Sequence, residues 1–164
     1  GAVPELSLSE NVLLTAHHRA PVARGGPLLD RRAAKAFAQR IIEEFDVRCD
    51  GPDSVASSLS GGNLQKFIVG REILQAPGVL VISQPTWGVD AGAAATIHRA
   101  LRALAADGVA VLLISQDLDE LMALCDRIGA LCAGRLSTFY ATADVDVRQV
   151  GLLMGGAASL EAAA

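Results

Sequence analysis

The chain has 164 residues, 51% of them hydrophobic and 20% charged, and its formal net charge is −4. This length allows one domain with a substantial core, and the three cysteines, odd in number and without metal-ligand spacing, indicate reduced thiols in a cytosolic protein. No apolar run reaches the roughly 18 to 20 residues of a membrane span, and no run of Lys or Arg is longer than Arg31-Arg32, which argues against membrane-spanning and nucleic-acid-binding proteins.

The first 60 residues favour helices joined by loops. Ser7 and Glu10 have the spacing of a capping box ahead of an apolar run, and Ala34, Phe37 and Ile41 recur at helical spacing. The expected elements are a helix from about residue 8, a Pro- and Gly-rich loop over 20–30, a helix over 30–45 and a polar loop over 50–58.

Beyond residue 60, apolar strands alternate with helices. We expect helices over 63–75, 91–106, 117–126 and 144–154, and strands over 79–82, 110–114, 128–132 and 136–140. The strands over 79–82 and 110–114 are unbroken apolar runs, which predict a parallel sheet covered by helices on both faces. The sequence therefore indicates an α/β protein with a helical first part.

The sharpest local signal is SSLSGGNLQK at residues 57–66. Two glycines between Ser60 and a helix start let backbone N–H groups converge at a helix N-terminus, and such a place binds phosphate. The simpler interpretation is that Ser60 caps the helix while Gly61 and Gly62 form the turn. The segment taken alone leaves both interpretations open.

The order of motifs along the chain resembles the later part of an ATP-binding-cassette (ABC) nucleotide-binding domain. LSGGN is similar to the signature motif, the strand ending Gln84-Pro85-Thr86 to the Walker B strand, Gly88-Val89-Asp90 to the D-loop, and ISQD at 114–117 to the switch motif. The chain particularly resembles the second cassette of tandem-cassette importers for sugars and nucleosides. This resemblance implies a helical subdomain over 1–62 and part of a parallel-sheet P-loop NTPase core over 63–155. The low complexity of the last residues predicts a flexible tail over 156–164.

The Walker A loop of this family is absent, since the sequence contains no Gly-Lys pair. The resemblance implies that the chain is a fragment of a longer ATPase that uses ATP and Mg²⁺. We expect the fragment alone to bind neither of them and to be inactive.

The Walker B and switch positions lack the family's ionisable groups. Ser83 stands at the position of the Asp that orients magnesium, Gln84 at that of the Glu that polarises water, and Gln116 at that of the switch His. Neither Ser83 nor Gln84 carries a negative charge, so a site built on this Walker B should bind metal weakly and turn over slowly or not at all.

The signature half keeps the family pattern at Ser60, Gly61 and Gly62, with Asn63 in place of Gln. By resemblance, Ser60, Gly61, Gly62, Asn63 and Gln65 would close over the nucleotide of another cassette. Asp90 would lie at the interface between the two cassettes. The implied partners are the first cassette of the same chain, the permease subunits in the membrane and a periplasmic or lipoprotein solute-binding protein. The implied location is the cytoplasmic face of the membrane.

Two other functions stay open at this stage. A cassette ATPase of DNA repair or translation also carries LSGG, although the acidic charge balance disfavours it. An inactive binding or dimerisation module is the third interpretation. Trp87, the only tryptophan, is expected to be packed or partly buried.

Overall fold

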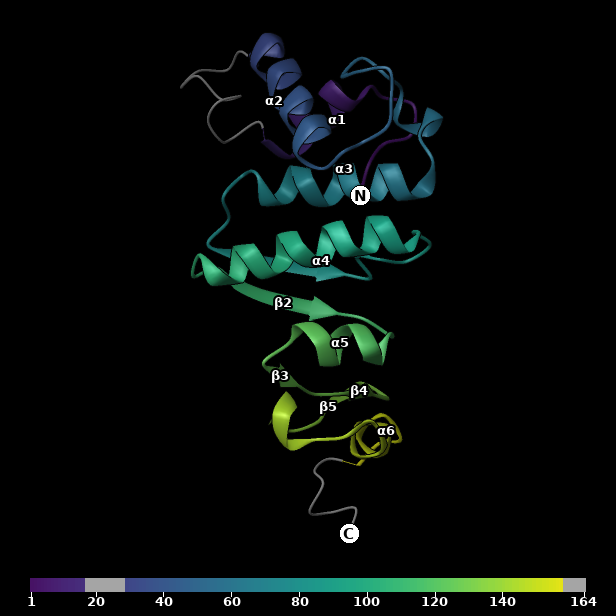
Figure 1. Cartoon of the computed structure of the whole chain (residues 1–164), viewed down its shortest axis with the longest axis vertical. Coiled ribbons are helices and arrows are strands. Elements are labelled where there is room, and N and C mark those ends of the chain that lie inside the picture. Colours follow the sequence, from purple (N-terminus) through teal and green to yellow (C-terminus); the bar gives the residue numbers. More distant parts are fainter. Residues whose placement is uncertain (17–28, 158–164) are drawn as a thin grey trace. The chain divides into compact units, whose positions relative to one another are not determined.

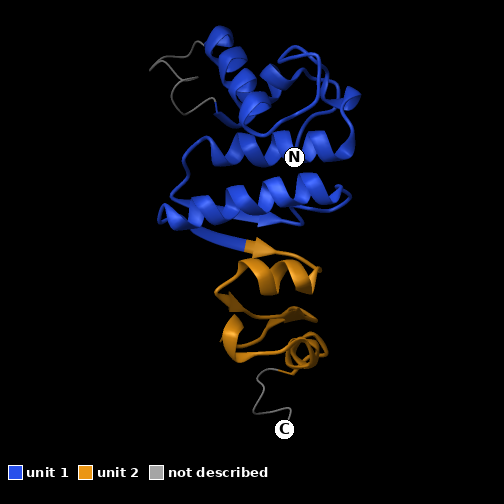
Figure 2. Cartoon of the chain, in the orientation of Figure 1, with its two compact units in different colours: residues 1–112 blue, residues 113–164 orange. Residues whose placement is uncertain are grey.

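A computed structural model describes residues 1–16 and 29–157 of the chain. The predicted loop over 20–30 therefore lies mostly outside the described residues, as does most of the predicted tail over 156–164. The chain divides into two compact units, Gly1–Leu112 and Leu113–Ala164 (Figure 2). The finer division expected near residue 62 stays a prediction. Among the described helices, none has both the length and the apolar character needed to cross a membrane.

Helix α1 (Leu8–Ala16) confirms the helix predicted from about residue 8. Its capping box is complete, because Glu10 N donates to Ser7 Oγ at 3.2 Å and Ser7 N donates to Glu10 Oε2 at 3.0 Å. The backbone N–H of Ser7 holds the pKa of the Glu10 carboxyl below its usual value, since it donates to the charged form. Local chemistry alone thus determines where this helix begins.

Helix α2 (Arg31–Glu44) confirms the second predicted helix. Asp30 caps it by accepting a hydrogen bond from Ala33 N at 2.9 Å. The apolar positions at helical spacing are buried and pack with α1 and α3 to form the core of the first unit. This core comprises Leu8, Val12, Ala16, Ala34, Phe37, Ala38, Ile41, Phe45, Val47, Ala56 and Phe67.

Two more helices and two strands follow, and the second strand crosses the boundary between the two units at Leu112. After the short 3₁₀ turn η1 (Ala56–Ser58), the chain forms α3 (Gly61–Ile73), β1 (Val79–Ser83), α4 (Ala91–Ala106) and β2 (Ala110–Ile114). Strand β1 pairs with β2, and both arrows point the same way in Figure 1. Helices α3 and α4 lie side by side as successive layers (Figure 1). All four predicted elements are confirmed, with ends shifted by two residues at most.

The sheet is not covered on both faces by the described residues, so that expectation was wrong. Leu80 is 7% exposed, whereas Val79 and Val81 on the opposite face of β1 are 65% and 62% exposed. Side chains alternate along a strand, so the helices of this chain bury one face only. Leu112 of β2 is also about half exposed, at 48%. An unbroken apolar run predicts a strand but does not say what covers it.

The second unit is built from short elements. They are α5 (Leu118–Leu124), β3 (Arg127–Ile128), β4 (Leu131–Cys132), β5 (Arg135–Leu136), β6 (Tyr140–Ala141), the 3₁₀ turn η2 (Thr142–Asp144) and α6 (Val147–Met154). Strand β3 pairs antiparallel with β6, and β4 with β5. Ile128, Val145 and Val150 form its core.

The strands predicted over 128–132 and 136–140 are each divided in two. Ser137 is buried, and its Oγ accepts a hydrogen bond from Ala130 N at 2.9 Å while donating to Thr138 O. A side chain thus takes the place of a ladder hydrogen bond at the break. The last helix begins at Val147 rather than near Asp144, because Asp146 and Gln149 form a capping box there.

Candidate functional site

The LSGG segment forms the N-terminus of α3. Ser60 is the N-cap residue, and its Oγ accepts a hydrogen bond from Asn63 N at 3.4 Å. Ser60 and Gly61 are exposed. The structure therefore confirms the capping interpretation. It is also compatible with anion binding, because the first N–H groups of a helix have no acceptor within the helix and carry partial positive charge.

The signature and D-loop segments lie side by side. A methyl group placed on Gly62 would be 3.6 Å from Asp90 Oδ2, and one on Gly61 would be 3.8 Å from Gly88 O. Both separations are ordinary van der Waals distances, so packing within this chain does not require either glycine. What the small residues provide is an open surface at which another molecule can approach the backbone.

Asp90 caps α4 in this arrangement. Its Oδ1 accepts a hydrogen bond from Ala93 N at 2.9 Å. This backbone donor is the main reason why the pKa of the Asp90 carboxyl lies below its usual value. The side chain is therefore a carboxylate at neutral pH, held beside Gly62 by the first turn of α4.

The end of the Walker B strand is tied to α3. Gln65 Nε2 donates a hydrogen bond to Gln84 O at 3.4 Å, and Trp87 N donates to the same oxygen at 3.2 Å. Gln84 adopts a left-handed backbone with φ of 51°, which is uncommon outside glycine. Ser83 precedes it as the exposed last residue of β1. In the structure Gln65 thus links two segments of the site.

The residues at the Walker B position do not fit a resident metal. Ser83 and Gln84 are neutral oxygen donors, whereas Mg²⁺ is usually held through carboxylates. Within the part of the chain that the structure describes, no group of three or more His, Cys, Asp or Glu side chains could hold a metal ion.

Gln116 belongs to the second unit, while the other predicted site residues belong to the first. It is exposed and directly precedes Asp117, the residue that caps α5 by accepting from Glu120 N at 3.1 Å. The residues brought together in the first unit are Ser60, Gly61, Gly62, Asn63, Gln65, Ser83, Gln84 and Asp90.

Trp87 corrects another expectation, because its side chain is 72% exposed rather than packed. It lies in the tight turn between β1 and Asp90, next to Gly88 with φ of 69°. No sequence pattern indicates this exposure, since a lone Trp after a Pro-Thr turn is compatible with either state.

Two residues of the site were missed by sequence reasoning. Arg48 N donates a hydrogen bond to Asn63 Oδ1 at 3.0 Å. Lys66, only 7% exposed, donates from Nζ to Asp46 O and lies 3.7 Å from the Asp46 carboxylate. Both contacts join segments 15 to 20 residues apart, so no local pattern could have indicated them.

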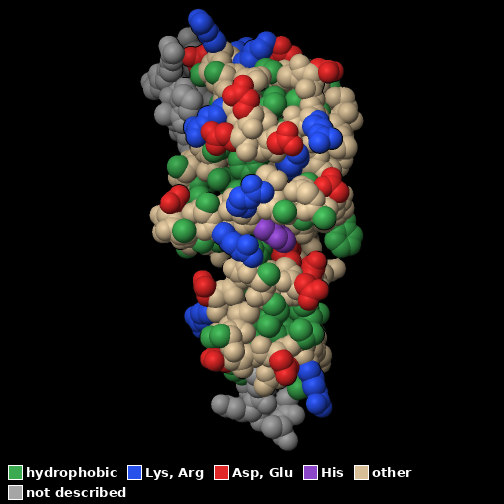
Figure 3. Space-filling view, viewed as in Figure 1, with side chains coloured by type: hydrophobic (Ala, Val, Ile, Leu, Met, Phe, Trp, Pro, Cys, Tyr) green, Lys and Arg blue, Asp and Glu red, His purple; other side chains and the backbone are tan. Residues whose placement is uncertain are grey.

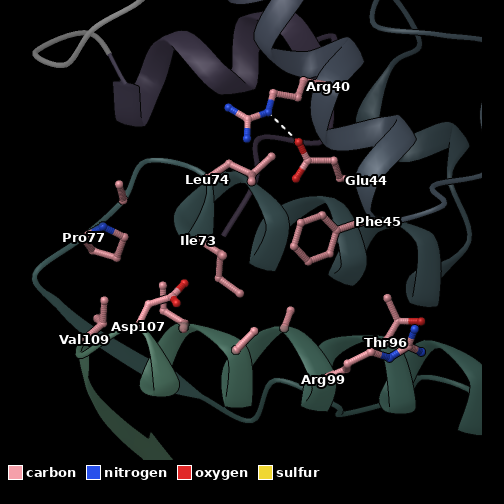
Figure 4. Close-up of a pocket in the computed structure, with 14 residues that line it drawn as sticks. Arg40, Glu44, Phe45, Ile73, Leu74, Pro77, Thr96, Arg99, Asp107 and Val109 are labelled. Atoms are coloured by element: carbon pink, nitrogen blue, oxygen red, sulfur yellow. Dashed lines mark hydrogen bonds and ion pairs between the residues drawn. The ribbon is translucent and has the colours of Figure 1, made fainter.

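A cavity of about 690 Å³ lies elsewhere in the first unit (Figure 4). Its lining comes from the last turns of α2 and α3 and from α4, and is mostly apolar, with Phe45 and Ile73 facing α4. An Arg40–Glu44 ion pair of 2.5 Å lies at its edge. None of the predicted site residues lines it, so we assign it no part in nucleotide chemistry.

Charged side chains do not form a basic patch on the face shown in Figure 3. Blue and red side chains are interspersed there over the first unit. This distribution agrees with the acidic net charge and gives no support to a nucleic-acid surface.

The chain is similar to import ATP-binding proteins over nearly all its length. It is 40% identical over 156 residues to the nucleoside import ATP-binding protein NupA of Lactococcus lactis subsp. cremoris, covering 95% of this chain and 31% of the relative. It is 38% identical over 162 residues to the guanosine import ATP-binding protein NupO of Bacillus subtilis, covering 99% and 32%. The chain thus spans about a third of the length of these curated relatives. No family model matches it.

Solved structures show the same fold. The dimeric structure of a bacterial ABC transporter cassette matches with a TM-score of 0.71 at 20% identity, covering 87% of this chain and 59% of the other. The structure of an ATP-binding subunit of an ABC transporter matches with a TM-score of 0.68 at 24% identity, covering 98% and 62%.

Proposed function

Since the chain belongs to the ATP-binding-cassette family, with relatives among sugar and nucleoside import ATP-binding proteins, we propose that it supplies the signature half of an ATP site shared with a second cassette. The observation that carries this proposal is the exposed N-terminus of α3, where Ser60, Gly61 and Gly62 present a hydroxyl and backbone N–H groups beside Asp90. A hydroxyl and free N–H groups at a helix start are suited to a phosphate.

The second cassette, which we call the partner cassette, would carry a complete Walker A loop and hold the nucleotide and its Mg²⁺. The first cassette of the same protein is our candidate for it. The parent protein would then drive uptake of a sugar or nucleoside, together with permease subunits and a solute-binding protein, from the cytoplasmic face of the membrane. In that assembly the bound Mg-ATP supplies the reacting phosphate, and the residues of this chain orient and enclose it.

The site built on this chain's own Walker B would contribute little hydrolysis. Ser83 and Gln84 cannot accept a proton at neutral pH. The backbone carbonyl of Gln84 accepts hydrogen bonds from Gln65 and from Trp87 N, which hold the end of the strand in place and leave the side-chain amide neutral. We therefore propose an asymmetric pair in which one site turns over and the other binds nucleotide at most weakly.

Calorimetry with Mg-ATP tests this function. We expect no detectable heat when the chain alone is titrated to millimolar nucleotide, because the sequence contains no Gly-Lys pair of a Walker A loop and the described residues include no group of three or more His, Cys, Asp or Glu that could hold a metal ion. Adding a partner cassette from a nucleoside-import relative should produce ATP-dependent association. Micromolar binding by the chain alone would contradict the proposal, since the nucleotide would then be held by residues other than those named here.

A further inference from the structure

Ser60 Oγ has both of its acceptor positions engaged. It accepts from Asn63 N at 3.4 Å and from Asn63 Nδ2 at 3.0 Å. A hydroxyl oxygen has two lone pairs and one proton. With both lone pairs directed at Asn63, the proton must point away from α3. Among the described residues, none accepts that proton, and Ser60 is exposed.

The orientation of the Asn63 amide is fixed by a neighbour. Arg48 N lies 3.0 Å from Asn63 Oδ1, and a backbone N–H can only donate. The amide oxygen therefore faces Arg48, and the amide nitrogen faces Ser60. The donors and acceptors of the series of hydrogen bonds follow from this: Arg48 N–H donates to Asn63 Oδ1, and Asn63 Nδ2–H donates to Ser60 Oγ.

Arg48 N, the first donor in this series of hydrogen bonds, is held in place by its surroundings. Arg48 follows the turn at Asp46, whose φ of 48° is left-handed. The buried Lys66, one helical turn after Asn63, donates to the Asp46 carbonyl and lies near its carboxylate. Phe45 and Val47 on either side of the turn are buried in the core. Arg48 N is thus positioned by core packing and by a second contact from α3.

We propose that Asn63 is a positioning residue, which turns the Ser60 hydroxyl outward as a hydrogen-bond donor to a phosphate oxygen of the nucleotide on the partner cassette. This inference rests on the proposed function, because the acceptor is the nucleotide of the shared site. It goes beyond that function by naming Asn63 and Arg48 as the groups that fix the direction of the Ser60 proton.

The test uses Asn63→Asp and Asn63→Ala in this chain. The Asn63→Asp side chain would keep an acceptor for Arg48 N but would accept the Ser60 proton instead of donating, so the hydroxyl would turn inward. Asn63→Ala removes both side-chain contacts without adding charge. Ser57→Asp is the charge control. It adds a carboxylate at the exposed start of the segment 57–66 and leaves the hydrogen bonds from Arg48 through Asn63 to Ser60 intact.

Three readouts are taken for each variant. Amide hydrogen exchange at Arg48 in the chain alone should stay slow for Asn63→Asp and become faster for Asn63→Ala. A ¹⁹F label on Trp87, the only tryptophan, reports ATP-dependent association with the partner cassette, because its side chain is 72% exposed before association. ATP turnover by the pair should fall about ten- to a hundredfold in kcat for Asn63→Asp, the range expected for losing a hydrogen bond to a charged group. Because the Walker A loop binds the nucleotide, KM should change little.

The outcomes separate the two proposals. An unchanged ¹⁹F signal of the wild-type chain with the partner cassette and Mg-ATP would overturn the proposed function, and this inference with it. Association together with wild-type kcat in either Asn63 variant would overturn the inference alone. An equal loss in Ser57→Asp would also overturn it, since charge would then explain the effect. A loss in both Asn63 variants, with association and the Ser57→Asp kcat preserved, is the expected result.

Discussion

At the scale of single residues, Asn11 organises the segment before α1. Its side chain is fully buried, with Oδ1 accepting from Val3 N at 2.7 Å and Nδ2 directed at the carbonyls of Val3, Leu6 and Ser7. Its own carbonyl accepts from Arg71 Nη1 at 3.2 Å. A polar residue within an apolar helix pattern is common in sequences, so nothing predicted this role.

We predict that Asn11→Ala lowers the free energy of unfolding by roughly 1 to 3 kcal/mol, because it removes a fully buried amide together with its hydrogen bonds to the backbone of Val3, Leu6 and Ser7. Leu14→Ala on the exposed side of α1 is the control and should change stability much less. Denaturant midpoints by circular dichroism give the comparison. Equal effects of the two substitutions would mean that the Asn11 contacts add no stability.

At the scale of elements, the sequence predicted helices better than short strands. Caps at Ser7, Asp30 and Asp90 mark helix starts by local chemistry, and α4 was predicted with both ends as observed. The divided strands of the second unit depend on the buried Ser137, a contact across a turn that no local pattern contains. The same holds for the site: its motifs were visible in the sequence, whereas the contact from Arg48 to Asn63 depends on the fold.

Helices α2 and α3 approach closely at one glycine. A methyl group on Gly70 would lie 2.6 Å from the ring of Phe45, which is itself buried. We predict that Gly70→Ala destabilises the protein by about 1 to 3 kcal/mol through overpacking, although alanine favours helices.

The matched control is Gly151→Ala in α6, where no atom lies within 4 Å of the added methyl group. It should stabilise α6 by about 0.5 to 1 kcal/mol through helix propensity alone. Thermal melting of both variants gives the comparison, and stabilisation by Gly70→Ala would show that Phe45 moves aside at no cost.

At the scale of the whole molecule, the chain contains the signature part of a nucleotide site and a strand, β1, whose two faces differ in burial. The signature segment leaves the N-terminus of α3 exposed, yet the described residues include no group of three or more His, Cys, Asp or Glu that could hold a metal ion. One face of β1 is likewise left exposed at Val79 and Val81. Both features are consistent with a chain that works only with other protein around it.

The exposed face of the sheet predicts self-association. Val79 and Val81 of β1 and Leu112 of the paired strand β2, here called the strip, are exposed apolar side chains, and exposed apolar surface promotes contact between copies. Light scattering at high concentration should therefore show species heavier than the monomer, and Val81→Lys should reduce them by placing a charge in the strip. Leu131→Lys, at a residue that is 73% exposed in the second unit, is the control and should leave the distribution unchanged. A strictly monomeric wild-type chain, or an equal reduction by both lysine variants, would exclude this strip as the contact surface.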